Sequence, residues 1–172
     1  MRKVLFRGFL DTVYLEKNKQ KIRDLFVRGE REILLVVESK GGLVSPTISL
    51  IDELLQMQEE GLRVNVLIRD AKSMALVLAL SFNGKKSMSK RACVEFHLGS
   101  LRLEASDFDH ATGVISTSIL ASFWRYEILL QSLLDKYEIS KSKKWMAKLY
   151  GSGWLTLTDE ESLQLGLVDE LV

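Results

Sequence analysis

The chain contains 172 residues, of which 47% are hydrophobic and 27% charged, and its formal net charge is +1. This length allows one domain with a sizeable core. The balanced charge excludes the strongly basic surface of a protein that binds nucleic acid or an anionic membrane. No apolar run approaches the ~20 residues of a transmembrane helix. The single cysteine excludes an internal disulfide and favours a reducing compartment. We therefore expect a cytoplasmic protein without membrane or nucleic-acid partners.

The first hundred residues alternate between strand and helix patterns. Residues 4–9 lack the long apolar core and cleavage site of a signal peptide, so we interpret them as a strand. The other predicted elements are strands at residues 33–38, 62–68 and 93–97, and helices at residues 14–28, 47–60 and 73–82. The helix at residues 73–82 is almost wholly apolar, which predicts burial on all sides. Repeated strand-helix-strand order predicts a parallel α/β sheet with right-handed crossovers.

The remainder of the chain is dominated by one long helical pattern. It runs over residues 107–137, with Gly113 as its one weak position. Its apolar content predicts burial against another subunit. A short helix follows at residues 140–149. Thr158 and Glu161 then form a capping-box pattern for a last helix, which Gly166 ends.

Chemically interesting residues follow three of the predicted strands. Gly41 and Gly42 come after the first buried strand, Ser73 opens the apolar helix, and His97 ends a later strand. The carboxyl ends of parallel strands lie at one edge of a sheet, so these residues are expected to converge. Nucleophilic acyl transfer needs a hydroxyl, a base and backbone N–H donors at one place.

Each of these residues also has a plainer interpretation. The glycines suit a tight turn, Ser73 suits a helix N-cap, and His97 suits a structural role at a strand end. His110 is the other histidine and lies in an acidic, solvated sequence, whereas Cys93 is expected to be a core thiol. Two histidines and one cysteine show no metal-ligand spacing, so we expect no metal site.

Six short features follow one another along the chain. They are Ser39-Lys40-Gly41-Gly42-Leu43-Val44, Lys72-Ser73-Met74, Gly84-Lys85-Lys86, a strand ending in His97, Ala105-Ser106-Asp107, and Thr158-Asp159-Glu160-Glu161 followed by Gly166-Leu167-Val168-Asp169. In this order they resemble the Clp protease proteolytic subunit family, within the wider Clp protease/crotonase superfamily. The resemblance extends over nearly the whole chain.

The resemblance implies a fold and a function. The fold would be one Clp-type domain over residues 1–172. It would comprise a head at residues 1–100, a protruding handle helix at 105–137 and a C-terminal head segment at 138–172. Ser73 would be the nucleophile and His97 the general base, and the N–H groups of Gly42 (or Gly41) and Met74 would form the oxyanion hole. The protein would cleave peptides or unfolded proteins without a cofactor, inside hexameric or heptameric rings stacked through the handle.

The chain also departs from the family pattern. A gapless alignment back from Gly166 puts Trp154 where the family has its catalytic Asp. The third triad member is therefore unknown. The site is a Ser-His dyad, takes an acid from Asp107, Asp109 or Asp159, or is inactive. Lys40 replaces a proline, and Leu98-Gly99 replaces Gln-Pro after the histidine. The first strand begins too early to leave a counterpart of the family's axial loop, which disfavours coupling to an AAA+ unfoldase.

Three functions therefore stand at this point. The first is a Clp-type serine peptidase. The second is a catalytically impaired structural or regulatory subunit, which the replaced acid favours. The third is a crotonase-type acyl-CoA enzyme, which shares the fold and the Gly-Gly turn but typically places carboxylates near its thioester.

Overall fold

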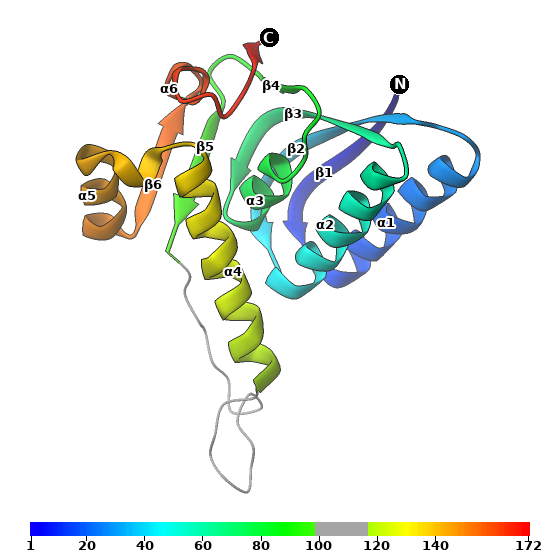
Figure 1. The fold of residues 1–172 in the computed structure, drawn as a ribbon, viewed down its shortest axis with the longest axis horizontal. Helices are drawn as coiled ribbons and strands as arrows, with labels where there is room; N and C mark the ends of the chain where they lie inside the picture. Colours follow the sequence, from blue (N-terminus) through cyan, green and yellow to red (C-terminus); the bar gives the residue numbers. More distant parts are fainter. Residues whose placement is uncertain (99–116) are drawn as a thin grey trace, which may run out of the picture.

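The computed structural model describes residues 1–98 and 117–172, and Figure 1 shows the arrangement of their helices and strands. The strands are β1 (Arg2–Leu10), β2 (Glu32–Gly42), β3 (Arg63–Lys72), β4 (Lys86–Met88), β5 (Cys93–His97), β6 (Trp154–Thr158) and β7 (Glu170–Leu171). The helices are α1 (Thr12–Val27), α2 (Val44–Glu59), α3 (Met74–Leu80), α4 (Thr117–Lys136), α5 (Lys143–Ser152) and α6 (Asp159–Gln164), with a short 3₁₀ turn at Ile139–Lys141.

The strands form one sheet in the order β1-β2-β3-β4-β7, and β5 pairs with both β3 and β6. All pairs are parallel except β5 with β6. The predicted parallel α/β fold class is thus confirmed. Because β2, β3 and β5 run in the same direction, their carboxyl ends lie at the same edge of the sheet.

The core forms where the sequence is most apolar. Ile33, Leu35 and Val37 of β2 are completely buried, and α1 and α2 cover one face of the strands (Figure 1). Every residue of α3 is buried, as its uniform apolarity predicts. A buried helix that follows directly on β3 fixes the position of the residue between them, which is Ser73.

Three strands escape prediction from the sequence. β4 and β7 contain three and two residues, too few to show a periodic pattern. The third strand is β6, where buried and exposed side chains do alternate: Leu155 and Leu157 are buried, while Trp154 and Thr158 are exposed. The predicted strands also extend further than their apolar runs. β2 includes both glycines of the turn, and β3 ends at Lys72.

Two motifs of the sequence meet beside β4 and β7, the last two strands in the order of the sheet. The Lys86 N–H donates to Asp169 Oδ2 at 2.7 Å, and the Asp169 N–H donates to the Lys86 carbonyl at 2.8 Å. The Gly84-Lys85-Lys86 turn and the Gly-Leu-Val-Asp ending therefore join β4 to the C-terminus. Their role in the chain is structural.

Helix α4 projects from the body of the molecule at its N-terminal end (Figure 1). Residues 99–116, which include His110, Asp107, Asp109 and the first part of the predicted handle, lie outside the described residues. Tyr126, Leu130, Leu133 and Leu134 of α4 are buried in the core of their own chain. Burial of these four side chains needs no second subunit. Trp124 and Ile128 remain 61% and 64% exposed.

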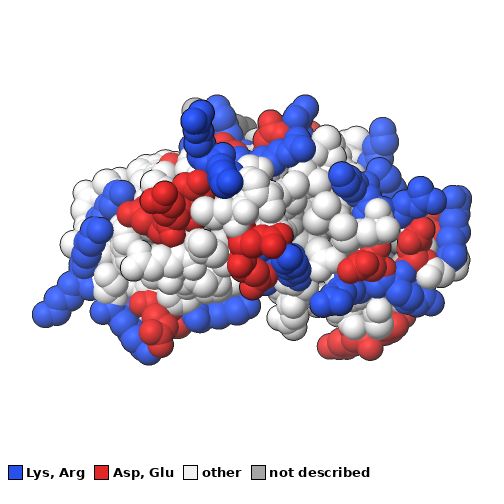
Figure 2. Space-filling model, turned by 90° about the horizontal axis from the view of Figure 1, so that it is seen from above, with Lys and Arg blue, Asp and Glu red and all other residues white. Residues whose placement is uncertain are grey.

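Charged side chains of both signs are interspersed on the face in Figure 2. This face presents no broad field of one sign that would attract a polyanion. Among the helices of the described residues, none combines the length and apolarity needed to cross a bilayer.

The capping box of α6 is confirmed. The Thr158 hydroxyl accepts from the Glu161 N–H at 3.1 Å, and the Glu161 carboxylate accepts from the Thr158 N–H at 3.0 Å. We expect Thr158→Ala to lower the free energy of unfolding by about 1 kcal/mol, because one helix N–H loses its acceptor. Urea unfolding measures the change. Thr158→Ser, which keeps the hydroxyl, should stay close to wild type, and equal losses in both variants would contradict the capping role.

Candidate active site

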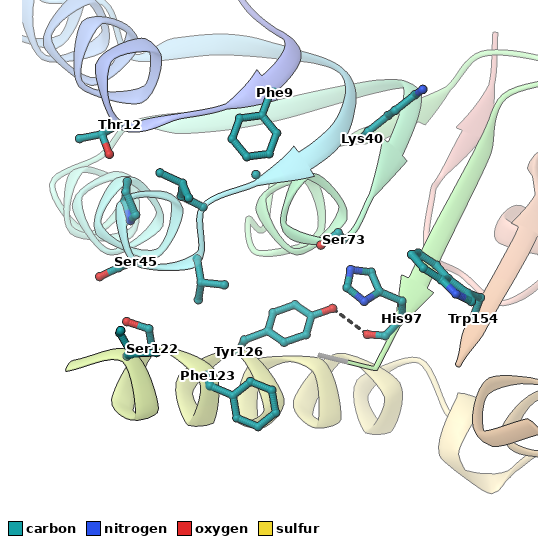
Figure 3. A pocket seen from close by; sticks show the side chains of 15 residues that line it. Phe9, Thr12, Lys40, Ser45, Ser73, His97, Ser122, Phe123, Tyr126 and Trp154 are labelled. Atoms are coloured by element: carbon teal, nitrogen blue, oxygen red, sulfur yellow. Dashed lines mark hydrogen bonds between the residues drawn. The ribbon is translucent and has the colours of Figure 1, made fainter. Parts of the chain in front are cut away.

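Residues from three strand ends line one cavity of about 680 Å³ (Figure 3). Gly42 comes from the end of β2, Ser73 follows β3, and His97 ends β5. The predicted convergence of these residues is therefore found in the structure. The cavity has aromatic walls formed by Phe9, Phe123, Tyr126 and Trp154.

Ser73 occupies a sharp turn between β3 and α3. Its backbone has φ 52° and ψ −132°, a conformation that non-glycine residues rarely adopt. Ser73 occupies the N-cap position of α3, but its side chain makes no capping hydrogen bond, so capping does not explain the serine. Backbone contacts hold the turn: the Ser73 N–H donates to the Glu95 carbonyl at 3.0 Å, and the Ser73 carbonyl accepts from Leu76 and Val77. The strained turn directs a half-buried hydroxyl into the cavity, as strand-to-helix turns do for the nucleophile in α/β hydrolases.

Gly41 lies directly against Ser73. A Cβ atom on Gly41 would lie 2.8 Å from Ser73 Cβ and 3.2 Å from Ser73 Oγ, and the φ of Gly41 is +102°. Gly42 is equally constrained, because a Cβ there would collide with the backbone of Leu10. The glycine pair therefore does more than form a turn. It lets the backbone of β2 lie in contact with the serine.

The backbone N–H groups around Ser73 differ in availability. The Gly41 N–H donates to Ser39 Oγ at 3.0 Å, and this hydroxyl donates to the Gly8 carbonyl at 2.6 Å. Met74 is the first residue of α3, where an N–H has no acceptor within the helix. Of the N–H groups predicted from the sequence, that of Met74 is thus better placed to donate to a ligand oxygen than that of Gly41, which already has an acceptor.

His97 is held at the end of β5 by contacts on several sides. Its Nδ1 lies 2.7 Å from the Leu98 carbonyl oxygen, and its ring stacks on Trp154 with centroids 4.6 Å apart. The Tyr126 hydroxyl donates to the His97 carbonyl at 2.7 Å (Figure 3). Burial, the dominant cause, raises the pKa of Tyr126 far above its usual range, and the Glu127 charge acts in the same direction, whereas hydrogen bonding with the Ser73 side chain opposes them. Tyr126 therefore remains a neutral hydrogen-bond donor between the serine and the histidine.

The position expected for the acid holds Trp154. In the antiparallel ladder of β5 with β6, Trp154 is the direct partner of His97. Asp159 follows Thr158, which pairs with Cys93 at the opposite end of β5, and its carboxylate accepts from the Arg91 N–H at 2.8 Å. Asp159 is therefore not available to His97. Asp107 and Asp109 lie outside the described residues.

Other ionisable groups near Ser73 have partners elsewhere. Lys72 Nζ lies 3.7 Å from a Glu95 carboxylate oxygen. Cys93 is half-buried rather than fully in the core, and its thiol donates to Asp70 at 3.2 Å. Burial and then the Asp70 contact raise the pKa of Cys93, which opposes a nucleophilic thiolate. Within residues 1–98 and 117–172, no three His, Cys, Asp or Glu side chains gather closely enough to hold a metal ion.

Comparison with known proteins identifies the fold. No family model and no curated protein matches the chain. Among solved structures, the catalytic domain of the ClpP protease from Plasmodium falciparum matches with a TM-score of 0.72 and 14% sequence identity. The match covers 99% of this chain and 85% of that one. The fold is ClpP-like. At this identity the comparison establishes the ClpP-like architecture and assigns no role to individual residues.

The sequence missed several residues that shape the cavity. Tyr126 is separated from His97 by 29 positions, and nothing in the pattern of α4 distinguishes it from the other buried residues of that helix. The Leu98 contact is made by a backbone carbonyl, for which no side-chain motif exists. Ser39 belongs to the glycine motif, and nothing in that motif predicts that its hydroxyl ties β2 to β1.

Proposed function

We propose that the protein is a ClpP-like serine endopeptidase with Ser73 as nucleophile and His97 as general base. The observation that carries the proposal is the strained turn that presents the uncapped Ser73 hydroxyl to a cavity shared with His97. A backbone conformation of this kind costs on the order of 1–3 kcal/mol and tends to be retained at functional sites. A plain helix start would need no such conformation.

The mechanism follows from the arrangement of groups. His97 takes the Ser73 proton as Oγ forms a bond to the carbonyl carbon of the scissile peptide. The N–H groups of Gly42 and Met74 stabilise the resulting oxyanion. The imidazolium then donates its proton to the leaving amine as the C–N bond breaks. Water, deprotonated by His97, hydrolyses the acyl-enzyme and restores Ser73. The aromatic walls of the cavity would receive apolar substrate side chains.

We further propose that the protein works in the cytoplasm as a homo-oligomer of ring type. The exposed Trp124 and Ile128 on α4 support this, because large apolar side chains on a projecting helix favour contact with another chain. Peptides or unfolded proteins are the proposed substrates, since an enclosed site excludes folded proteins.

One observation favours a second function, that of a catalytically impaired structural or regulatory subunit. Trp154 occupies the place opposite His97, and none of the described carboxylates forms a hydrogen bond or ion pair with the imidazole. Nor do the described residues show a hydrogen bond between Ser73 and His97. Catalytic hydrogen bonds are often long in the absence of substrate, so the geometry leaves the first proposal standing.

Labelling with a fluorophosphonate probe tests the two functions against each other. We expect wild-type protein to be labelled on the peptide that contains Ser73, identified by mass spectrometry, and Ser73→Ala to show no labelling. Ser45 is an exposed serine that lines the same cavity, so Ser45→Ala is the matched control and should label like wild type. Absence of labelling in folded, assembled wild-type protein would favour the impaired subunit.

Substitution of Tyr126 tests whether its hydroxyl helps to hold His97, and the expected effect is modest. We expect Tyr126→Phe to lower the free energy of unfolding by about 1 kcal/mol, because the His97 carbonyl loses its donor. The rate of fluorophosphonate labelling should fall as well, since His97 is less firmly held. Urea unfolding and labelling kinetics measure the two effects. An unchanged stability together with an unchanged labelling rate would show that the Tyr126 hydroxyl does not support the site.

A further inference from the structure

The contact between His97 and Leu98 defines which imidazole nitrogen carries the proton. A carbonyl oxygen can only accept a hydrogen bond. The 2.7 Å separation of His97 Nδ1 from the Leu98 oxygen therefore requires a hydrogen on Nδ1. In a neutral imidazole the other nitrogen, Nε2, then carries the lone pair. This is the tautomer that a general base needs.

Leu98 is itself firmly held. Its N–H donates to the Gly153 carbonyl at 3.0 Å, which continues the β5–β6 ladder by one more bond. The preceding carbonyl, that of His97, accepts the Tyr126 hydroxyl. The peptide between His97 and Leu98 is thus fixed by Gly153, directly before β6, on one side and by Tyr126 of α4 on the other. Its position restricts the direction of the next carbonyl along the chain.

The Trp154 indole restricts the imidazole in a second way. The two rings are inclined by 39° with centroids 4.6 Å apart, which is a close aromatic contact. Tyr126 lies across from it, with its ring centroid 5.8 Å from that of His97 (Figure 3). Rotation of the imidazole away from Leu98 would break the stacking with Trp154.

We propose that the Leu98 carbonyl and the Trp154 ring together position His97 in the Nδ1–H tautomer, in place of the triad carboxylate. The inference deepens the proposed function, because the tautomer matters for catalysis only if His97 is the base. In the serine-protease template the acid holds the tautomer and also stabilises the imidazolium. A neutral carbonyl performs the first task and contributes less to the second. The site would therefore be an oriented dyad that turns over more slowly than a full triad.

Nitrogen-15 NMR of the imidazole rings tests the tautomer directly. The chain has two histidines, so His110→Asn assigns the signals of His97. Above the pH at which the ring is protonated, we expect the His97 spectrum to show a protonated Nδ1 and an unprotonated Nε2. A proton on Nε2, or an even mixture of tautomers, would overturn the inference. This readout needs no substrate, so it stands apart from the labelling test of the proposed function.

Substitutions of Trp154 test the second half of the inference. Trp154 is 49% exposed, so its replacement should leave the fold intact, which circular dichroism checks. Trp154→Ala should give mixed tautomers and a labelling rate lower by roughly 3- to 10-fold, as for the loss of one aromatic contact. Trp154→Phe, which keeps an aromatic ring at this position, should show the wild-type tautomer and the wild-type labelling rate. Tyr150→Ala, which removes an exposed aromatic side chain from outside the residues that line the cavity, is the matched control. Wild-type tautomer populations in Trp154→Ala would show that the indole does not position His97.

Discussion

Replacing His97 by glutamine is expected to lower the rate of fluorophosphonate labelling and of peptide hydrolysis by about 10³- to 10⁴-fold. A positioned general base contributes up to about 10⁴-fold to such reactions. Glutamine is close to histidine in size and polarity but cannot take the Ser73 proton. It can still fill the space between Trp154 and Tyr126, so the fold should be retained.

The second histidine provides the control for this experiment. His110→Gln changes the same residue type and should label at the wild-type rate. Fluorogenic peptides and the probe should give the same ranking, because both reactions need the Ser73 proton removed. If His97→Gln retains most of the labelling, then His97 is not the base, and the proposed mechanism fails even if Ser73 is the labelled residue.

The sequence predicts the part of the fold in which strands and helices alternate. Strands β1, β2, β3 and β5 and helices α1 to α3 were all found, because each combines an apolar run of adequate length with a turn signal. The strands β4 and β7 were missed because two or three residues carry no period. The ends of β2 and β3 were set too early. Their last residues are polar or glycine, and they are strands because neighbouring strands continue beside them.

The site is only partly predictable for a similar reason. The approach of Ser73 and His97 to one cavity was predictable, because strand order alone brings the carboxyl ends of β3 and β5 together. Whether Ser73 caps α3 depends on its φ and ψ, which a sequence pattern cannot supply. The contacts of His97 are made by a backbone carbonyl and by residues from β6 and α4. Only the long-range pairing of the chain brings Trp154 and Tyr126 to His97.

Trp154 determines what the proposed site offers to His97. A gapless alignment back from Gly166 matches Trp154 with the catalytic Asp of the family that the sequence resembles. The β5–β6 ladder puts Trp154 beside His97. A tryptophan offers no carboxylate to His97, and the proposal instead has the imidazole positioned by this ring contact and by the Leu98 carbonyl. Gly41, unlike Trp154, lies where no side chain would fit, because its backbone touches Ser73. A side chain at this position should therefore displace the serine directly.

We expect Gly41→Ala to lower the labelling rate and the kcat/KM for peptides by up to about 10²-fold. An alanine Cβ would lie 2.8 Å from Ser73 Cβ and 3.0 Å from the Lys72 carbonyl, so the serine must move by several tenths of an ångström. Displacements of about 1 Å in a catalytic group cost on the order of 10²-fold. The substitution also places alanine at φ +102°, which destabilises the fold by about 1 kcal/mol or more.

The conformational cost must be separated from the displacement of Ser73. Gly29 has a similar φ of +92°, and a Cβ there would meet nothing within 4 Å. Gly29→Ala should therefore lower the free energy of unfolding by about as much as Gly41→Ala, as measured by urea unfolding, and should keep full activity. If both variants lose the same activity, the effect of Gly41→Ala arises from destabilisation. If Gly41→Ala is as active as wild type, the contact between the β2 turn and the serine has no catalytic importance. Loss of activity in Gly41→Ala alone would mean that the glycine is needed for the position of the nucleophile.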